Sequence, residues 1–541
     1  VAGSTPHARE RDERRELRDQ EPHPGAHCRV AAERDDDVLD PGVEEHLRDQ
    51  HAPHADSESE PCPANHTTKL GLGGHSRVAS GGGSRGPHQG SHANRTHFTV
   101  YALSVGMDDG GADASRRDVL KAAVAAGGVS ALSACLEATE DDDPVPTGPD
   151  DLSALTERQH AWDDRVRTDD HGNTLLPRHQ VLLYLTLPGS GPPDDSDRES
   201  VEAVLRTLER AYERSHDGLL FSVAYSPRYF DRYDASLPAS IDLPEPRRLS
   251  PFESPTFDRQ DAMVHLASDR AEVVLAAEAA LTGAEATVNG VSMEQTLTDT
   301  LEVADRRTGF VGAGMPAERQ AGLAGIPSSN PVPEASPLFM GFIAGFRQNQ
   351  ATEDYVTLAD GPFAGGTTKH VSNLRMRLDD WYGEQSYDDR VAELFSPAHA
   401  DRELVEGVGE NLGDDNGVTP EIVDAIRDHA REFARVGHAQ KAARANRDDE
   451  GRVRTLRRHF ESTDDDEASL HFPSLQREIT TFEEVREAMN GTDLTDEPAI
   501  RQRVNNGILE YVFTKRRGNF LVPPRSLRAL PTPDGRVPGV E

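Results

Sequence analysis

Cysteine thiols are the most reactive side chains in this sequence, and only one of the three stands in a context that indicates chemistry. Cys28, Cys62 and Cys135 lack the paired spacing of a zinc site, a redox pair or a disulfide framework. Cys135 ends a run of small and apolar residues from Ala122 to Ala134, which follows the pair Arg116-Arg117. A membrane-spanning helix needs about 20 strongly apolar residues, and this run is shorter and rich in alanine and glycine. The pattern predicts that the Cys135 thiol is modified.

This order of features resembles a twin-arginine export signal that ends in a lipobox, Leu132-Ser133-Ala134-Cys135. It predicts that residues 107–135 are the signal and that the twin-arginine translocase is a partner. The mature chain would begin at Cys135 and be lipid-anchored at the extracytoplasmic face of the cell membrane. Twin-arginine export carries folded proteins, which suits a protein that takes up a cofactor beforehand. The alternative for this run is a short buried helix.

The residues on either side of this segment are predicted to lie outside a folded core. Residues 1–106 have no sustained apolar periodicity and hold 11 of the 22 histidines. We interpret them as a disordered upstream extension, with Met107 as the true start. A histidine-rich metal-binding arm is the alternative, although the histidines lack a repeated ligand spacing. Residues 136–175 begin with acidic residues and prolines and are predicted to be a solvated linker.

The excess of acidic over basic residues disfavours some classes of binding partner. The chain holds 95 acidic and 58 basic residues, for a net charge of −37, which disfavours nucleic acid and anionic membrane surfaces as partners. Only five basic residues are lysines, and aromatic residues make up 5% of the chain. An acidic, lysine-poor surface suits a protein from a halophilic source, because concentrated salt screens its self-repulsion. Long disordered acidic segments are the alternative explanation.

Two segments of the chain have the apolar patterns of folded domains. The first, residues 176–330, predicts strands at 180–187, 218–225 and 261–268, with helices after a Ser196/Glu199 capping box and at 269–281. A closing strand would complete a ferredoxin-like βαββαβ unit. The second segment, residues 331–530, predicts strands at 367–378, 470–475 and 518–522, and helices at 387–395 and 481–489. Residues 282–337 are interpreted as the crossover and 531–541 as a tail, so the fold class is α+β.

Particular stretches of both segments resemble dye-decolorising (DyP-type) haem peroxidases. Phe221 to Asp231 is similar to a strand and turn of that family, and Gly365 to Trp381 follows another of its strands without a gap. The resemblance covers about residues 176–530 and implies two ferredoxin-like domains that form a dimeric α/β barrel. The chain is identified as a divergent, exported lipoprotein member of this family.

The resemblance also implies a cofactor and its contacts. The family binds haem b, and the stretch from Gly437 to Arg447 is similar to its proximal-histidine segment, which makes His438 the axial ligand of the haem iron. Arg457 is then the distal arginine that polarises a bound peroxide, and Arg375 is a further haem-binding residue. Considered alone, His438 is a histidine on a charged helix, and Arg457 belongs to a basic pair that could form surface ion pairs.

The family's distal aspartate has no counterpart here. The matching stretch offers Ala344 if Gly341-Phe342 is aligned and Gln348 if Gly345-Phe346 is aligned, and neither side chain can shuttle a proton. One interpretation is a peroxidase that uses hydrogen peroxide and an unknown reductant through a ferryl haem. The other is a surface lipoprotein that binds haem or porphyrin with little or no turnover. A relative without a cofactor, and assembly as a homo-oligomer, stay open.

The remaining motifs indicate no other chemistry. Gly309 to Gly314 is rich in glycine but follows no clear predicted strand, so it is interpreted as a loop. The acidic clusters Asp464 to Glu467 and Asp414-Asp415 could hold a divalent cation, but on so acidic a chain they are more simply solvated loops. The Gly-x-Ser-x-Gly match at Gly82 to Gly86 falls within the extension that is predicted to be disordered, and the sequence contains no phosphate-binding loop.

Overall fold

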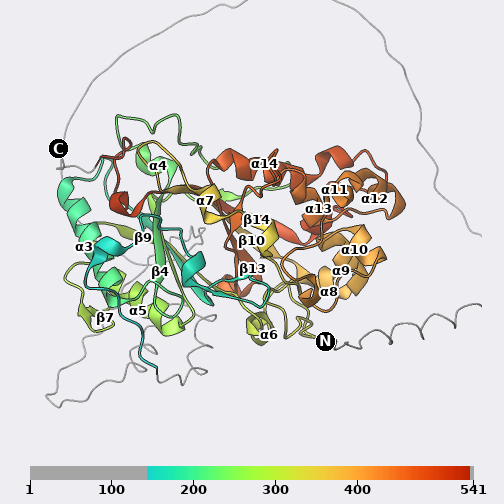
Figure 1. Ribbon diagram of the computed structural model, residues 1–541, viewed down its shortest axis with the longest axis horizontal. Helices are drawn as coiled ribbons and strands as arrows, with labels where there is room; N and C mark the ends of the chain where they lie inside the picture. The colour runs from blue at the N-terminus through green and yellow to red at the C-terminus, as the bar shows by residue number, and fades with distance from the viewer. Residues whose placement is uncertain (1–142, 537–541) are drawn as a thin grey trace, which may run out of the picture. The chain divides into compact units, whose positions relative to one another are not determined.

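The computed structural model describes residues 143–536, all of which belong to one compact unit (Figure 1). The predicted export signal with Arg116, Arg117 and Cys135, and the predicted extension 1–106, lie outside the described residues. Within residues 143–536, no helix is both long and apolar enough to cross a bilayer.

The first half of the described chain is a ferredoxin-like unit. Its elements follow the order βαββαβ, and its four strands pair antiparallel in the order β9-β3-β6-β4. They are β3 (His179–Thr186), α3 (Asp195–Ala211), β4 (Leu220–Tyr225), β6 (Ala262–Ser268), α5 (Ala271–Leu281) and β9 (Glu302–Phe310).

The second half repeats the same order with a longer first crossover. Its strands pair as β14-β10-β13-β12, with β11 also on β13. The strands and the last helix are β10 (Thr367–Met376), β11 (Leu456–Arg457), β12 (Phe460–Ser462), β13 (Ser469–Gln476), α14 (Ile479–Asn490) and β14 (Val512–Val522). The helices between β10 and β11 are α8 (Leu378–Gly383), α9 (Tyr387–Leu394), α10 (Pro397–Asp401), α11 (Pro420–Asp424), α12 (Ile426–Glu432) and α13 (His438–Ala443).

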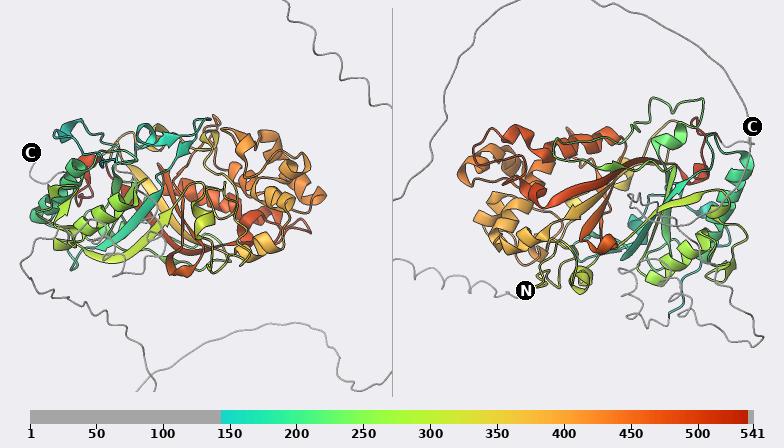
Figure 2. Two further views of the ribbon diagram at one scale, coloured as in Figure 1. Left: turned by 90° about the horizontal axis from the view of Figure 1, so that it is seen from below. Right: turned by 180° about the vertical axis from the view of Figure 1, so that it is seen from behind.

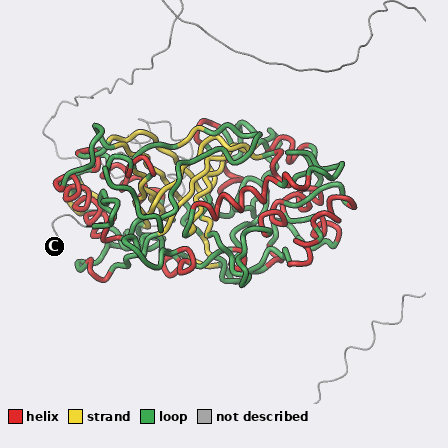
Figure 3. Tube along the Cα trace, turned by 90° about the horizontal axis from the view of Figure 1, so that it is seen from above, coloured by secondary structure: helices red, strands yellow, loops and turns green. Residues whose placement is uncertain are grey.

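Single bridges join the two sheets into a closed barrel. Glu461 of β12 pairs with Phe310 of β9, and Leu521 of β14 pairs with Tyr225 of β4. The helices of each half lie outside its own sheet, and the strands lie between the two helical layers (Figures 1, 2 and 3). The predicted fold class, an α+β dimeric barrel of two ferredoxin-like units, is confirmed.

Strand alternation decides what each sheet buries. On β3, Val181, Leu183 and Leu185 join the large apolar cluster beneath α3 and α5. Leu182 and Tyr184 point the other way, into the smaller cluster between the two sheets. A strand that is buried on both faces is therefore apolar along most of its length, which is why its sequence pattern was clear.

Several short elements lie between the main ones: β1 (Arg167–Thr168), β2 (Thr174–Leu175), α4 (Pro227–Phe230), β5 (Thr256–Phe257), β7 (Thr287–Val288), β8 (Val291–Ser292), α6 (Met315–Arg319) and α7 (Glu353–Val356). The predicted capping box of α3 was wrong by two residues. Asp194 is the N-cap, and its carboxylate accepts from the backbone N–H of Asp197, which reciprocates. Aspartate serves this position as well as serine does.

The predicted crossover 282–337 was wrong in one respect, because it contains β9, the closing strand of the first half. Gly309 belongs to this strand, so the glycine-rich stretch does follow a strand. Gly309 lies where β9 meets β12, and a Cβ atom there would stand 2.2 Å from the Glu461 carbonyl oxygen. Close approach of two backbones therefore requires glycine at this position.

The predicted solvated linker is wrong for residues 143–175, which pack on the barrel. Trp162 is 1% exposed, and the guanidinium of Arg458 lies 4.2 Å from its ring centroid. The side chain of Gln159 donates to the carbonyls of Val223 and Pro523 and accepts from the Val223 N–H. Burial of an aromatic ring and a satisfied amide outweighs the polar composition of this segment.

Candidate functional site

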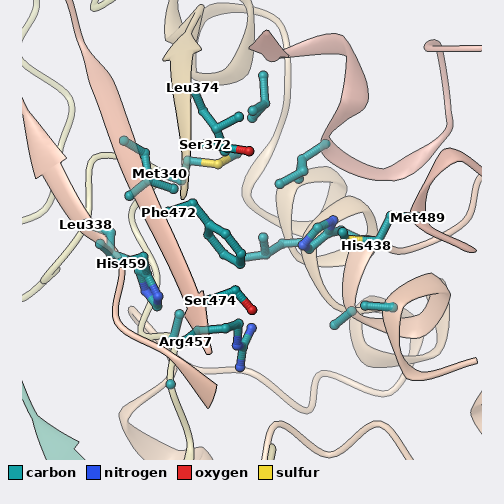
Figure 4. A pocket seen from close by; sticks show the side chains of 18 of the residues that line it. Leu338, Met340, Ser372, Leu374, His438, Arg457, His459, Phe472, Ser474 and Met489 are labelled. Atoms are coloured by element: carbon teal, nitrogen blue, oxygen red, sulfur yellow. The ribbon is translucent and has the colours of Figure 1, made fainter. Parts of the chain in front are cut away.

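A cavity of about 230 Å³ lies on the outer face of the second sheet, beneath α13 and α14 (Figure 4). Strands β10, β13 and β14 form its floor, α13 and α14 form one wall, and the segment 338–346 forms another. Most of the lining is apolar, including Phe342, Phe472 and Phe482 and three of the seven methionines, Met340, Met376 and Met489. Such a lining suits a flat apolar ligand, and methionine side chains adapt readily to its shape.

His438 enters this cavity from the first residue of α13. Two glycines hold the start of the helix against its neighbours, since a Cβ at Gly437 would stand 2.0 Å from the Phe395 carbonyl oxygen. Gly507 has a φ of +59°, and a Cβ there would stand 2.9 Å from the His438 backbone nitrogen. The sequence thus fixes the backbone of His438 by close packing.

The imidazole of His438 is neutral and has no hydrogen-bond partner among the described residues. Burial lowers its pKa to about 3, and the nearby charges of Lys441 and Arg457 act in the same direction. Neutral imidazole is the form that binds a metal, because a ring nitrogen then keeps its lone pair. The cavity therefore holds a nitrogen donor with no competing hydrogen bond.

Arg457 faces the same cavity from the opposite, strand side (Figure 4). Its Nε donates to Gln350 Oε1 at 3.3 Å and its Nη2 donates to the Asn349 carbonyl at 3.1 Å. No carboxylate of the described chain pairs with it, and burial lowers its pKa to about 10. It keeps its charge at neutral pH, so the cavity contains a fixed cation without a counter-ion, which favours an anionic ligand.

Two polar residues that the sequence analysis missed lie beside Arg457. His459 and Glu461 also line the cavity, at every second position after Arg457; His459 lies between β11 and β12, and Glu461 lies in β12. Burial lowers the pKa of His459 to about 3, and its Nδ1 has no partner. Burial raises the pKa of Glu461 to about 8, and its Oε2 also lacks a partner. The period of two between polar residues was the available signal.

Two further arginines carry positive charge at the cavity wall. Arg486 of α14 and Arg517 of β14 line the cavity and share the carboxylate of Glu253. Arg517 donates through Nη2 alone, at 3.0 and 3.1 Å, and its Nε and Nη1 have no partner. Two guanidiniums against one carboxylate leave a net positive charge here, which suits the carboxylates of an amphipathic ligand.

The structure brings His438, Arg457 and Ala344 together but excludes Arg375 and Gln348 from the cavity. Arg375 forms an ion pair with Glu467 and does not line the cavity, unlike Leu374 and Met376 on the same strand. Gln348 is exposed and hydrogen-bonds to Asp414, whereas Ala344 lines the cavity.

Other polar residues of the second half have structural partners. Both ring nitrogens of His370 are engaged, with Asn519 Oδ1 at 2.7 Å and Ser372 Oγ at 2.8 Å. Asp464 accepts hydrogen bonds from the backbone and side chain of Thr308. In residues 143–536, neither predicted acidic cluster gathers three metal-ligating groups.

The family model that matches this chain is described as "Family of unknown function (DUF7405)" and covers residues 177–524. The chain belongs to this family. The matched region begins just before β3 and ends just after β14, so it contains the whole barrel and the cavity. No curated protein sequence matches the chain.

Solved structures of DyP-type peroxidases are similar to the chain at low identity. The encapsulated DyP-type peroxidase from Mycobacterium smegmatis has 14% identity and a TM-score of 0.44, with 66% of this chain and 96% of that chain covered. DypB from Rhodococcus jostii RHA1 has 17% identity and a TM-score of 0.45, with 66% and 96% covered. The dye-decolorizing protein from V. cholerae has 13% identity and a TM-score of 0.39, with 68% and 99% covered.

Proposed function

We propose that this chain is an exported, lipid-anchored haem peroxidase of DyP type that reduces hydrogen peroxide and oxidises an external reductant. The observation that carries the proposal is the pairing of a neutral, unpartnered imidazole with an unpaired guanidinium in one apolar cavity. An imidazole suits the axial position on haem iron, and a guanidinium suits the charge that develops on peroxide.

The residues present fit haem in their chemistry. His438 would bind the iron, the aromatic and methionine side chains would contact the macrocycle, and Arg486 and Arg517 carry positive charge for its carboxylates. The three cysteines lack the C-x-x-C-H spacing of covalent attachment, which favours haem b. The cavity of about 230 Å³ is smaller than typical ligand pockets of roughly 300–1,000 Å³, so wall side chains must move on binding.

Haem, when bound, supplies the redox chemistry that reduces peroxide, and the chain supplies the surroundings. Gln350 and Asn349 orient Arg457, whose charge stabilises a peroxide oxygen as negative charge builds on it. The apolar walls exclude water and strengthen that interaction. Ala344 carries no exchangeable proton, so it contributes nothing to proton transfer.

The second candidate function is a haem- or porphyrin-binding lipoprotein with little peroxidase turnover. Ala344 favours it, because this residue lines the cavity at the position where the family carries an aspartate. Loss of a positioned acid or base typically costs about 10²–10⁴-fold in rate. The two functions differ in turnover with peroxide and not in cofactor binding.

Export and anchoring belong to the same proposal and rest on the sequence pattern of residues 107–135. Replacement of Arg116 and Arg117 by lysine is expected to retain the chain in the cytoplasm. Cys135→Ser is expected to release it from the membrane fraction after export. Both variants leave residues 143–536 unchanged, so cell fractionation tests export and membrane anchoring without disturbing the cavity.

The absorption spectrum of protein titrated with haemin tests cofactor binding. Wild type is expected to show a Soret band that saturates at one haem per chain, and His438→Ala is expected to lose or strongly shift it. His399→Gln is the matched control, since His399 is a buried histidine of the same half that does not line the cavity. A wild-type protein without a Soret band would end the haem proposal, and oxidation of a bulky dye with peroxide separates the two functions.

A further inference from the structure

The cavity contains a buried carboxyl group that the proposed function does not use. Glu461 of β12 is 1% exposed and lies where the two halves of the barrel meet, paired with Phe310. Its Oε1 accepts the Phe339 N–H at 2.8 Å, while its Oε2 is buried without any partner. A buried polar atom without a partner costs free energy, so its presence in a cavity wall points to a ligand or a proton.

Glu461 is also without a counter-ion. Tyr382 of α8 interacts electrostatically with Glu461. The charged and titratable groups that share the cavity lining with Glu461 are Arg457, His459, His438 of α13, Arg486 of α14 and Arg517 of β14. Tyr382 donates to the Phe339 carbonyl at 2.7 Å, and no described cation forms an ion pair with Glu461. Burial without a cation disfavours the carboxylate, which agrees with the pKa of about 8.

The position of His459 connects this carboxyl to Arg457. Arg457 and Glu461 pair with Ser474 and Leu470 of β13 in one continuous register, so the intervening His459 falls on the same face, about 6.6 Å along the chain from each. The ring of His459 packs parallel to Phe472, with their centroids 6.1 Å apart, and its Nδ1 has no partner. A neutral imidazole can accept a proton at one nitrogen and donate from the other.

We propose that Glu461 stores and exchanges a proton inside this cavity, and that His459 connects it to a ligand held at Arg457. The segment whose counterpart would carry an aspartate in the resembled family here supplies Ala344, but its Phe339 N–H holds Glu461 in place. The acid–base group has therefore changed position within the cavity. Glu461 titrates close to neutral pH, where a general acid or base is most effective.

The part of this inference that concerns peroxide rests on the proposed function. When the O–O bond of hydrogen peroxide breaks, both protons finish on the oxygen that leaves as water. Glu461 donates its proton to the leaving oxygen and takes up the proton released by the other, so no net proton is consumed. The two electrons that the cleavage requires come from the haem of the proposed function.

Infrared spectroscopy of the haem-free protein tests the proton site directly. A protonated buried carboxyl has a C=O stretch above the amide bands, and we expect this band to titrate with a midpoint near 8 and to shift rapidly in D₂O. Glu461→Gln should remove that component. Glu393→Gln is the matched control, because Glu393 is also buried with a raised pKa but does not line the cavity. A difference spectrum between wild type and Glu461→Gln without such a band would overturn the inference.

A kinetic test on haem-loaded protein adds the functional readout. We expect Glu461→Gln to slow the reaction with peroxide by about 10²–10⁴-fold without loss of the Soret band, and Glu461→Asp to recover part of the rate. Glu393→Gln should leave the rate unchanged. If the protein did not bind haem, the proposed function would be refuted, while the infrared result on Glu461 would remain valid. An unchanged rate in Glu461→Gln with haem bound would refute the role of Glu461 and leave the proposed function intact.

Discussion

The two sheets have the same strand topology, but their outer faces are covered differently. In the first half, α3 and α5 lie directly on the sheet, and the contact is apolar and closed. The residues that meet there include Val181, Leu183, Leu185, Val204, Leu205, Leu208, Val273, Val274 and Ala277. In the second half, the corresponding face is floored by Ser372, Leu374, Phe472 and Ser474 and holds a cavity under α13 and α14.

The cavity lies in the half whose first crossover is longer. The first crossover of the second half is extended by several short helices between β10 and β11, which bring His438 over the sheet. The outer face of the first sheet is filled by apolar side chains, whereas the cavity on the second sheet is bordered by His459 and Glu461, which have buried polar atoms without partners. The following experiments test this difference between the two faces.

The largest expected difference is in the response to side-chain truncation. Leu205 of α3 is 0% exposed, so Leu205→Ala should lower the free energy of unfolding by about 2–5 kcal/mol. Leu470→Ala on the cavity floor should cost under about 2 kcal/mol, because Leu470 is only partly buried and already borders a void. Urea unfolding measures both changes. Equal losses in the free energy of unfolding would contradict the contrast between a packed face and a face that borders a cavity.

Loss of the unpaired cation should affect reactivity and not folding. In haem-loaded protein, Arg457→Leu is expected to lower the rate of peroxide-dependent dye oxidation by about 10²–10³-fold, as loss of a positioned charge donor does elsewhere. Arg452→Leu is the control, since Arg452 is exposed and pairs with Asp448 and Glu450. Stopped-flow rates that fall equally in both variants would show that position in the cavity does not matter.

The carboxyl of Glu461 should make the free energy of unfolding depend on pH. Its pKa is 4.5 when exposed and about 8 when folded, so the unfolded state loses its proton first and stability falls between these values as pH rises. At pH 7 the penalty is about 3 kcal/mol, at 1.36 kcal/mol per unit. Glu461→Gln should therefore be more stable than wild type at pH 7 and equal to it near pH 4. Denaturant titrations at both pH values check this, and a variant less stable at pH 7 would contradict it.

The smallest expected effect comes from restoring a carboxylate at Ala344. This residue is exposed at the cavity mouth, so Ala344→Asp should fold normally and raise the rate with peroxide by about 10-fold, the low end for a positioned acid or base. Ala364→Asp, at a loop outside the cavity, is the control. If both substitutions leave the rate unchanged, the absence of an aspartate does not limit turnover.

The apolar pattern of the chain predicted most of the barrel. Strands β3, β4, β6, β10 and β13 and helices α3, α5, α9 and α14 were found within a few residues, because each has a clear buried face. Strand β9 was missed because it carries Asp305, Arg306 and Arg307, whose charges are satisfied by ion pairs that only the folded sheet creates. The short strands β11 and β12 gave too little periodic signal.

The candidate site could be predicted only in part. His438 and Arg457 were found through resemblance, and the structure brings them to one cavity. Glu461 was missed although polar residues alternate at 457, 459 and 461, because so short a run does not distinguish a buried strand face from a solvated one in an acidic chain. Arg375 lies on the face of β10 opposite to Leu374 and Met376, which line the cavity. Its side chain forms an ion pair with Glu467, and the sequence alone does not reveal this partner.

The most direct test of the central claim is a crystal structure of the haem-loaded protein with iron located by its anomalous scattering. The account predicts one iron peak at coordination distance from a ring nitrogen of His438, with Arg457 across the cavity and the wall side chains displaced to admit the macrocycle. An iron peak away from His438, or a cavity unchanged from that of about 230 Å³ described above with haem bound elsewhere, would contradict it.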